Sequence, residues 1–310
     1  MLKKELGKER LAVIDLGSNT FHLLIVEKQE NPPFFKVLYR KREFVYVLGP
    51  NAKYFGIEEQ KRATACISKF RELLDKHKVK NIVPAATAAF RMAKNGDSFI
   101  AKLEFVLQSQ INIFSGQKEA EFIFKGVKLM QNAFENTNLI MDIGGGSVEF
   151  ILFKKNKIIL SESFNTGISF LRHNFKMSEP IALSEKKLIN DYLEKQHTRF
   201  FEQLKFHKPG QLIGSSGPFE ILEHLTSVSP LVYGNKFTRK TVLNYSNQIS
   251  TSTKKERLEI EHMPTNRADL SKESFLLLEH TLLSIECIEK VCVSPFSLKE
   301  GIIAHYLNLE

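Results

Sequence analysis

The sequence predicts an α/β protein made of two domains of similar build. The first observation is alternation, because apolar runs at strand spacing are followed by stretches with apolar residues at helical spacing. The second is a repeat: VIDLGSNTFHLLIVEK (13–28) and IMDIGGGSVEFILFKK (140–155) align without gaps at a shift of 127 residues. The third is length, since 310 residues are enough for two domains with cores of ordinary size.

The first domain is expected to begin with a meander of strands. LAVIDLG (11–17) is an apolar run that ends at a glycine, which is typical of a buried strand before a turn. FHLLIVEK and FFKVLYRKREFVYVLG follow it and indicate further strands of the meander. Residues 57–78 carry apolar side chains at helical spacing and end in lysine and histidine, which suits a helix C-terminus.

The rest of the first domain, expected to span 1–127, continues the alternation of strand and helix. Ile82–Val83 indicates a strand followed by a turn, DSFIAKLEFVLQSQ a helix, and INIF a strand. SGQKEAEFIFKGVKLMQ indicates another helix. Ser115 is its candidate N-cap, although Glu119 lies one residue too far along for a capping box.

The second domain is expected to span 128–297 and to begin in the polar stretch Val127–Asn138, ahead of the second repeat. LSEKKLINDYLEKQHTRFFEQLKF indicates a helix within it. Near the end, VCVSPFSLKEGIIAHYLNL indicates a strand, a turn and a final helix. We expect that helix, at about 298–310, to pack back on the first domain.

The charge balance favours anionic partners. Lysine and arginine number 44 against 35 aspartates and glutamates, so the formal net charge is +9. Such a balance suits nucleic acid, phosphorylated metabolites, polyphosphate or an acidic membrane surface, but it also describes an ordinary solvated surface. The sequence shows no zinc-finger spacing, no heptads and no ribonucleoprotein aromatic motif, so we expect no nucleic-acid partner.

The sequence predicts a cytoplasmic protein with no membrane partner. Its first ten residues are charged and lack the apolar segment of a signal peptide, and no apolar run reaches the length of a transmembrane helix. The three cysteines, Cys66, Cys287 and Cys292, show no metal-ligand spacing. We expect them to be thiols in a reducing compartment.

Glycine turns follow an aspartate in both copies of the repeat. Asp15 matches Asp142 and Gly17 matches Gly144, and a third glycine turn, LIGSSGPFEIL, follows a short strand later in the chain. Backbone N–H groups at such turns form anion sites, because no Cβ blocks a phosphate. The sequence contains neither a P-loop nor a dinucleotide-binding glycine motif.

One acidic residue interrupts the strand that follows the triple glycine. Glu149 stands where an apolar residue is expected, and it matches His22 in the first repeat. On a strand that returns from the turn, Glu149 would converge with Asp142 on one ligand. The alternative is a strand residue that faces solvent.

Several motifs together resemble one family. DLGSNTFHLLI, ATAAFR, SGQKEAEFIFKGV, DIGGGSVEFIL, a GSSG turn, PTNRADL and SLKEG occur in the order seen in the exopolyphosphatase / guanosine-pentaphosphate phosphatase family, from about Leu11 to Tyr306. That family belongs to the superfamily of sugar kinases, actin and heat-shock chaperone ATPases. The resemblance implies two actin-like (ribonuclease H-like) α/β domains with a cleft between them. Longer members add a helical region, so we expect a short, two-domain member.

The resemblance also implies a catalytic base. A glutamate near the domain hinge of these enzymes activates the attacking water, in a motif that usually reads Gly-x-Glu-Glu-Ala. This chain has Gly116-Gln117-Lys118-Glu119-Ala120, so Glu119 is the implied base and Lys118 replaces the first glutamate. A lysine that approached the carboxylate would keep it ionised and weaken it as a base.

The resemblance implies a magnesium ion held by Asp142 and Glu149, with Asp15 nearby; Mn²⁺ is the alternative cation and K⁺ a candidate activator. Arginine suits bidentate contact with phosphate. The implied phosphate-contacting residues are Gly17, Ser18, Asn19, Arg91, Gly144, Gly145, Gly146, Ser147, Gly214, Ser215 and Arg267. Arg267 has a structural ion pair as its alternative role. His22 either packs or is a polar neighbour of the site.

The predicted function is hydrolysis of the terminal phosphoanhydride of inorganic polyphosphate by a water that Glu119 activates. The first alternative is removal of the same phosphoryl group from guanosine pentaphosphate. A second is a non-catalytic module that binds polyphosphate or an alarmone, with Lys118 marking a degenerate site. A third is a phosphotransferase, as in the kinases of the superfamily. A homodimer is left open as the assembly.

Overall fold

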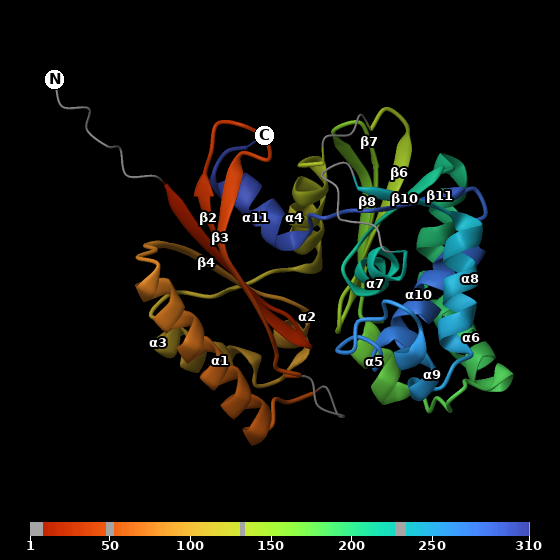
Figure 1. Ribbon diagram of the computed structural model, residues 1–310, viewed down its shortest axis with the longest axis horizontal. Coiled ribbons are helices and arrows are strands. Elements are labelled where there is room, and N and C mark those ends of the chain that lie inside the picture. Colours follow the sequence, from red (N-terminus) through yellow and green to blue (C-terminus); the bar gives the residue numbers. More distant parts are fainter. Residues whose placement is uncertain (1–8, 48–52, 131–133, 227–233, 310) are drawn as a thin grey trace. The chain divides into compact units, whose positions relative to one another are not determined.

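The computed structural model describes residues 9–47, 53–130, 134–226 and 234–309. The chain divides into two compact units (Figure 1). Unit 1 comprises Met1–Leu129 and Leu298–Glu310, and unit 2 comprises Met130–Ser297. The chain therefore leaves unit 1 after Leu129 and returns to it at Leu298.

Unit 1 contains a five-stranded sheet in the order β3-β2-β1-β4-β5. The first three strands form the expected antiparallel meander, and β4 and β5 run parallel to β1. This is the ribonuclease H-like arrangement of an actin-like domain. The strands are β1 (Arg10–Leu16), β2 (Thr20–Lys28), β3 (Phe35–Phe44), β4 (Asn81–Ala86) and β5 (Asn112–Ile113).

Side-chain alternation gives the unit 1 sheet one apolar face that α1 and α3 cover. Ile14 of β1 and Leu23 of β2 are fully buried on that face, where they pack with Phe70 of α1 and Leu103 of α3. Asp15 lies on the opposite face of β1, and α11 also contacts β1. The helices of unit 1 are α1 (Ile57–Lys76), α2 (Ala88–Met92), α3 (Gly96–Leu107), α4 (Gly116–Lys128) and α11 (Leu298–Tyr306).

Two details of unit 1 differ from the sequence expectation. The strand expected at Ile82–Val83 runs from Asn81 to Ala86 and includes Pro84, and the short helix α2 replaces the expected turn. A proline is tolerated there because β5 pairs with β4 only at Ala85 and Ala86, so at residue 84 the strand has β1 as its neighbour on one side.

Unit 2 contains a six-stranded sheet in the order β10-β11-β9-β6-β7-β8. Its antiparallel meander β6-β7-β8 and the parallel strand β9 repeat the arrangement of β1, β2, β3 and β4, so the two sequence repeats occupy equivalent hairpins. The strands are β6 (Thr137–Ile143), β7 (Val148–Lys154), β8 (Lys157–Phe164), β9 (Gln211–Ser215), β10 (Asn235–Thr238) and β11 (Lys290–Val293).

The core of unit 2 lies on one face of its sheet, where Met141, Phe150 and Leu212 pack against buried residues of α6 and α10. In α10 almost every residue is buried, including the polar side chains of Glu273, Glu279 and His280. The helices are α5 (Ile168–Asn174), α6 (Leu183–His207), α7 (Gly217–Leu225), α8 (Arg239–Ser250), α9 (Lys254–Glu259) and α10 (Ser271–Ser284).

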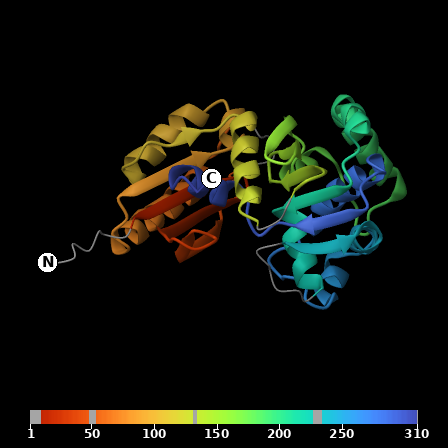
Figure 2. The same ribbon diagram turned by 90° about the horizontal axis from the view of Figure 1, so that it is seen from above.

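The final helix, α11, packs on α4 within unit 1, and both views show the two helices side by side (Figures 1 and 2). Their backbones come so close that a Cβ on Gly301 would lie 1.7 Å from the carbonyl oxygen of Phe122 and 2.8 Å from the nitrogen of Gly126. Only glycine fits at this crossing. Within the described ranges, no helix has both the length and the apolar character needed to cross a membrane.

Candidate functional site

The glycine turns of the two repeats are closed in the same way. The N–H of Gly17 donates to the carbonyl of Thr20 over 3.1 Å, and the N–H of Gly144 donates to the carbonyl of Ser147 over 2.9 Å. A Cβ on Gly17 would lie 2.9 Å from the Thr20 oxygen, and one on Gly144 would lie 3.2 Å from the Ser147 oxygen. Closure of the turn is therefore a sufficient reason for glycine at residue 17, and it leaves little room for a side chain at residue 144.

The triple-glycine turn rests on the N-terminal end of α5. The backbone N–H groups of residues 167–169 donate to the carbonyl oxygens of residues 144–146, at 2.7 to 3.3 Å. A Cβ on Gly167 would meet the turn at 2.6 Å, so Gly167 is needed for this contact. Among the described residues, no hydrogen bond uses the N–H of Gly145 or Gly146. The carbonyls of the turn are thus fixed by the protein, and these two N–H groups remain available to an anion.

The first turn is held by the same kind of contact. After β3, the N–H groups of Val45 and Tyr46 donate to the carbonyl of Asn19 at 2.9 and 3.0 Å, and that of Val47 donates to the carbonyl of Ser18 at 2.9 Å. In both repeats, therefore, the segment after the third strand binds the carbonyls of the glycine turn.

Asp142 and Glu149 lie directly opposite each other on β6 and β7. Because side chains alternate along a strand, both point to the face opposite the apolar core of unit 2. Both are buried, at 6% and 2% exposure, so Glu149 is not the solvent-facing strand residue of the alternative interpretation. The register thus brings both carboxylates to one side of the sheet, and their convergence on one ligand stays a prediction.

Three serines surround these carboxylates, and the sequence had indicated one of them. Ser163 of β8 lies opposite Glu149 and donates to its Oε1 over 2.7 Å. Ser215 of β9 lies opposite Asp142 and is 1% exposed, and its hydroxyl has no hydrogen-bond partner among the residues of the described ranges. The hydroxyl of Ser297, just before α11, donates to Oδ2 of Asp142. Ser297 lies in the SLKEG motif, but its partner is 155 residues away, so no local pattern indicates the contact.

In unit 1, the positions equivalent to those of Asp142, Glu149 and their serine neighbours carry different side chains. Asp15 lies opposite His22, which lies opposite Arg42 on β3. The hydroxyl of Thr20 is 2.9 Å from Nε2 of His22. On the other side, β4 places Ala85 next to Asp15. This row therefore has one carboxylate, where the row in unit 2 has two, and His22 has a polar neighbour in Thr20.

The residues at Asp142 and Glu149 fit a magnesium ion. Over the described part of the chain, no group of three or more histidine, cysteine or acidic side chains could hold a metal by itself. Magnesium at phosphate-handling sites is bound by one or two carboxylates, with waters and substrate phosphates completing its coordination. Two buried carboxylates and an unpartnered hydroxyl on Ser215 match that requirement.

Glu119 is held by an arginine within unit 1. Ser115 precedes helix α4, and its hydroxyl accepts from the N–H of Lys118 over 3.2 Å, so the expected N-cap is confirmed. Glu119, in the first turn, is 6% exposed. Nη1 of Arg91, on α2, lies 2.7 Å from Oε2 of Glu119 and also donates to the carbonyl of Phe114 over 2.6 Å. The arginine expected at the phosphate is thus paired with the expected base.

Lys118, which replaces a glutamate of the family motif, contacts Glu121 and Phe122. Its Nζ lies 2.9 Å from Oε2 of Glu121 and 4.7 Å from the centre of the Phe122 ring. The Lys118 ammonium is thus paired with Glu121, and its effect on Glu119 as a base stays a prediction.

In the third glycine turn, packing, backbone conformation and an ion pair account for Gly214, Gly217 and Arg267. A Cβ on Gly214 would lie 2.0 Å from the ring of Phe219, so packing alone demands glycine there. Gly217 has a left-handed backbone with φ of 48°. Arg267 makes an ion pair with Glu220 of α7, and its Nη1 is 3.4 Å from the carbonyl of Gly217. These contacts agree with the structural alternative for Arg267, and its contact with substrate stays a prediction.

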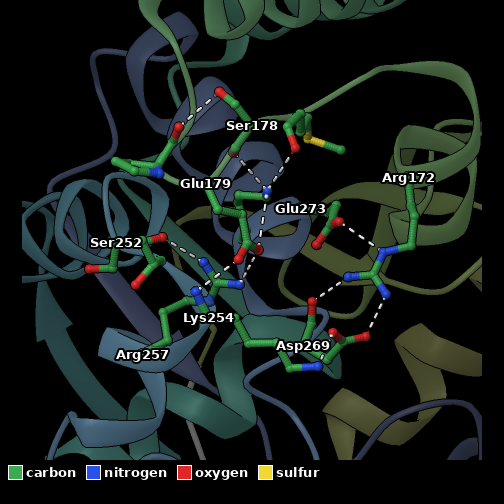
Figure 3. Close-up of polar contacts among 12 residues, drawn as sticks. Arg172, Ser178, Glu179, Ser252, Lys254, Arg257, Asp269 and Glu273 are labelled. Atoms are coloured by element: carbon green, nitrogen blue, oxygen red, sulfur yellow. Dashed lines mark hydrogen bonds and ion pairs between the residues drawn. The ribbon is translucent and has the colours of Figure 1, made fainter.

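A network of ion pairs anchors α5, on which the triple-glycine turn rests (Figure 3). Arg172 of α5 donates to Oδ2 of Asp269 over 2.6 Å and to Oε1 of Glu273 over 2.9 Å. Burial disfavours the charge of Asp269, but hydrogen bonds from Lys254 and Arg172 outweigh it and lower the pKa of Asp269 to about 2. Asp269 and Arg267 belong to the same PTNRADL segment, so this segment links α5 to the third glycine turn.

The same network has a fully buried arginine at its centre. Arg257 of α9 donates to Oε1 of Glu179 over 2.8 Å, to the carbonyl of Ser252 over 2.7 Å and to the carbonyl of Ala268 over 3.0 Å (Figure 3). Nζ of Lys272 donates to the carbonyl of Ser178 over 3.1 Å. No sequence motif indicated this network, because its members come from segments far apart in the chain.

Two buried histidines lie behind the triple-glycine turn. Nε2 of His197 is 3.2 Å from the hydroxyl of Thr166, which directly precedes Gly167, and the rings of His197 and His280 are 5.6 Å apart between centroids. Burial lowers the pKa of His197 to about 3 and that of His280 to about 4. Both rings are therefore neutral near pH 7.

Several known proteins are similar in sequence to this chain. The model of the Ppx/GppA phosphatase family matches residues 50–310. A bifunctional 3-dehydroquinate synthase/phosphatase of Fusobacterium nucleatum is 35% identical over 222 residues, which cover 66% of this chain and 32% of that protein. A guanosine-5'-triphosphate,3'-diphosphate pyrophosphatase of Pseudoalteromonas translucida is 36% identical over 172 residues, 54% of this chain and 34% of that protein. The chain thus spans about a third of the length of these curated relatives.

Solved structures match the chain over nearly its whole length. The crystal structure of an exopolyphosphatase from Cytophaga hutchinsonii is 30% identical, with a TM-score of 0.88 over 97% of this chain and 98% of that one. The Ppx/GppA family member of Aquifex aeolicus is 22% identical, with a TM-score of 0.79 over 97% and 98%. With the two sheets described above, these matches confirm the predicted α/β fold, and the cleft stays a prediction.

Proposed function

Because the chain belongs to the Ppx/GppA phosphatase family, we propose that it is an exopolyphosphatase, which hydrolyses the terminal phosphoanhydride bond of inorganic polyphosphate. The observation that carries the proposal is the pair of buried carboxylates, Asp142 and Glu149, opposite each other beside a glycine turn with two unused N–H groups. Magnesium at phosphate-handling sites is bound by one or two carboxylates, so a pair of buried carboxylates on one face of the sheet suits such a site.

In the proposed reaction, Glu119 accepts a proton from the attacking water. The water oxygen forms a bond with the terminal phosphorus, and the bond from that phosphorus to the bridging oxygen breaks, which leaves the chain one phosphate shorter. The N–H groups of Gly145 and Gly146 donate to phosphate oxygens. When magnesium is bound at Asp142 and Glu149, it neutralises part of the phosphate charge.

Arg91 has two roles in this proposal. In the structure it pairs with Glu119 over 2.7 Å, which orients the carboxylate. An arriving phosphate offers the same guanidinium two oxygens in a geometry that suits a bidentate contact. Transfer of Arg91 from Glu119 to phosphate would leave the carboxylate better able to accept a proton.

Two observations bear on the substrate. The net charge of +9 favours a polyanion with many phosphates, and the matched structure from C. hutchinsonii is described as an exopolyphosphatase. The second candidate substrate is guanosine pentaphosphate, because the P. translucida relative is named for guanosine-5'-triphosphate,3'-diphosphate. Both substrates lose a terminal phosphoryl group. The cytoplasmic location, the choice of Mg²⁺ over Mn²⁺, activation by K⁺ and a homodimer stay predictions.

The test is phosphate release from long-chain polyphosphate and from guanosine pentaphosphate, each with and without ADP. We expect transfer of the phosphoryl group to water, so that inorganic phosphate is the main product with or without ADP. We also expect a higher kcat/KM for polyphosphate than for guanosine pentaphosphate. ATP formed from ADP would instead support a phosphotransferase. Tight binding of polyphosphate without turnover would support a binding module and would overturn the hydrolase.

A further inference from the structure

Asp142 and Glu149 each accept a hydrogen bond from a serine that belongs to a different segment of unit 2. We infer that Ser297 and Ser163 are positioning residues, which hold these two carboxylates in the orientation that binds a divalent cation. The inference rests on the proposed role of Asp142 and Glu149. It assigns a task to two residues for which the sequence had indicated no role.

Ser297 is placed where its hydroxyl can fix Asp142. It is 9% exposed and follows the turn after β11, and its hydroxyl donates to Oδ2 of Asp142, which is 6% exposed. A hydrogen bond to one carboxylate oxygen stops the group from rotating and favours its charged form. Groups that bond to metal ligands in this way set the ligand direction and strengthen cation binding.

Ser163 does the same for Glu149 from the neighbouring strand. Its register opposite Glu149 brings the hydroxyl to 2.7 Å from Oε1, and Glu149 is 2% exposed. Glutamate has one more rotatable bond than aspartate, so a fixed donor removes more freedom from its carboxylate. The two hydrogen bonds come from different segments, since Ser163 is on β8 and Ser297 lies after β11.

Ser215 is the third serine next to these carboxylates, and its hydroxyl indicates that a ligand binds here. It lies opposite Asp142 on β9 and is 1% exposed, and its hydroxyl has no partner in the described part of the molecule. A buried hydroxyl without a partner is uncommon and is explained when a bound group satisfies it. Ser163 and Ser297 thus hold the two carboxylates. Ser215, on β9 between β6 and β11, is placed to contact the cation or phosphate that the carboxylates bind.

A different role for Ser297 is capping of α11, because it directly precedes that helix. Loss of a cap lowers stability and leaves cation affinity unchanged. Loss of a positioning hydrogen bond lowers cation affinity in a protein that stays folded. Cation affinity and melting temperature, measured on the same variants, therefore separate the two roles.

The experiment measures the Kd for Mn²⁺ by electron paramagnetic resonance of the free ion, on the full chain without substrate. We expect Ser297→Ala and Ser163→Ala to raise this Kd by roughly 10–100-fold, the usual cost of losing such a partner. Ser297→Thr, which keeps a hydroxyl, should restore most of the affinity. Ser294→Ala is the matched control, because this buried serine of the same loop bonds to the backbone of Phe296.

Each outcome decides a different point. Wild-type affinity in both Ser297→Ala and Ser163→Ala, with Asp142→Asn losing the ion, would overturn the inference and leave the proposed cation site standing. A lower melting temperature at unchanged Kd would assign Ser297 to capping alone and also overturn its positioning role. Absence of Mn²⁺ binding in the wild type would overturn both the inference and the cation role of Asp142 and Glu149.

Discussion

Arg91 and Glu119 form an ion pair of 2.7 Å between two helices, α2 and α4, that are separated in the chain by α3 and β5. The carboxylate is almost fully buried, and the arginine is also fixed by the carbonyl of Phe114. The proposed base is therefore held in one direction before any substrate arrives. This relationship gives the first prediction.

Glu119→Gln should lower kcat for polyphosphate by roughly 10²–10⁴-fold, because the amide cannot accept a proton from water. It should leave KM within a few-fold, since the side chain keeps its shape. Steady-state phosphate release at saturating Mg²⁺ measures both constants. Glu72→Gln, at an exposed position on α1, is the control and should retain wild-type kcat. A Glu119→Gln enzyme with more than half of wild-type turnover would remove Glu119 as the base.

Asp142→Asn and Glu149→Gln should raise the magnesium concentration needed for half-maximal activity, because a hard cation prefers anionic oxygen ligands. Activity measured across a Mg²⁺ titration gives this value for each variant. Glu162→Gln is the control, since Glu162 lies on the neighbouring strand but is exposed on its other face. An unchanged Mg²⁺ requirement in both site variants would show that these carboxylates are not ligands.

Salt should weaken the binding of polyphosphate more steeply than that of guanosine pentaphosphate. A long chain that spans many basic residues loses many weak contacts together, as the screening length falls with ionic strength. The measurement is KM for each substrate between about 0.05 and 0.5 M KCl, a range that crosses the relevant screening distances. Parallel rises would indicate that the charge of +9 is only a solvated surface, and guanosine pentaphosphate would become the favoured substrate.

The buried histidines should make unit 2 sensitive to mild acid. An unfolded histidine has a pKa near 6.5, whereas burial lowers the pKa of His197 to about 3 and that of His280 to about 4. Below pH 6.5 the unfolded chain takes up protons that the folded chain does not, so stability falls as the pH drops from 6.5 towards 4. At pH 5 each histidine should cost about 2 kcal/mol.

His280→Leu should therefore reduce the loss of stability between about pH 7.5 and about pH 5, because leucine binds no proton. Urea unfolding at the two pH values measures the change. His207, exposed at the end of α6, provides the control His207→Asn, which should keep the full pH dependence. If His280→Leu and the wild type lose equal stability on acidification, another group is responsible.

Gly301→Ala should destabilise unit 1 by about 3 kcal/mol, since its Cβ would lie 1.7 Å from the carbonyl oxygen of Phe122 and α11 would have to move off α4. Urea unfolding monitors the loss. Gly210→Ala is the matched control, because a Cβ at Gly210 meets no atom within 4 Å. Equal stability of the two variants would mean that α11 does not depend on this close contact.

The sequence was sufficient for the parts of the site that local rules govern. The two hairpins follow from apolar runs that end at Gly17 and Gly144, and side-chain alternation then brings Asp142 and Glu149 to one face. The cap of α4 follows from a serine before a helical run. In each case the partners lie within a few residues or on strands joined by one turn.

Contacts between distant segments could not be read from the sequence. Ser297 reaches Asp142 across 155 residues, and Arg91 meets Glu119 only because α2, too short to show a helical pattern, replaces the expected turn. Gly214 looked like part of a phosphate turn, yet the ring of Phe219 fills the space that its side chain would need. Such features depend on three-dimensional packing, which one-dimensional periodicity does not encode.

The return of the chain to unit 1 at Leu298 has a consequence for protein synthesis. The ribosome releases α4 early, but α11, which packs on it at Phe122 and Gly126, emerges only after the whole of unit 2. Unit 2 is continuous in the chain and can fold as soon as it leaves the exit tunnel. The half that is translated first is thus the half that is completed last, and a nascent chain halted before Leu298 would carry a finished second unit and an open first one.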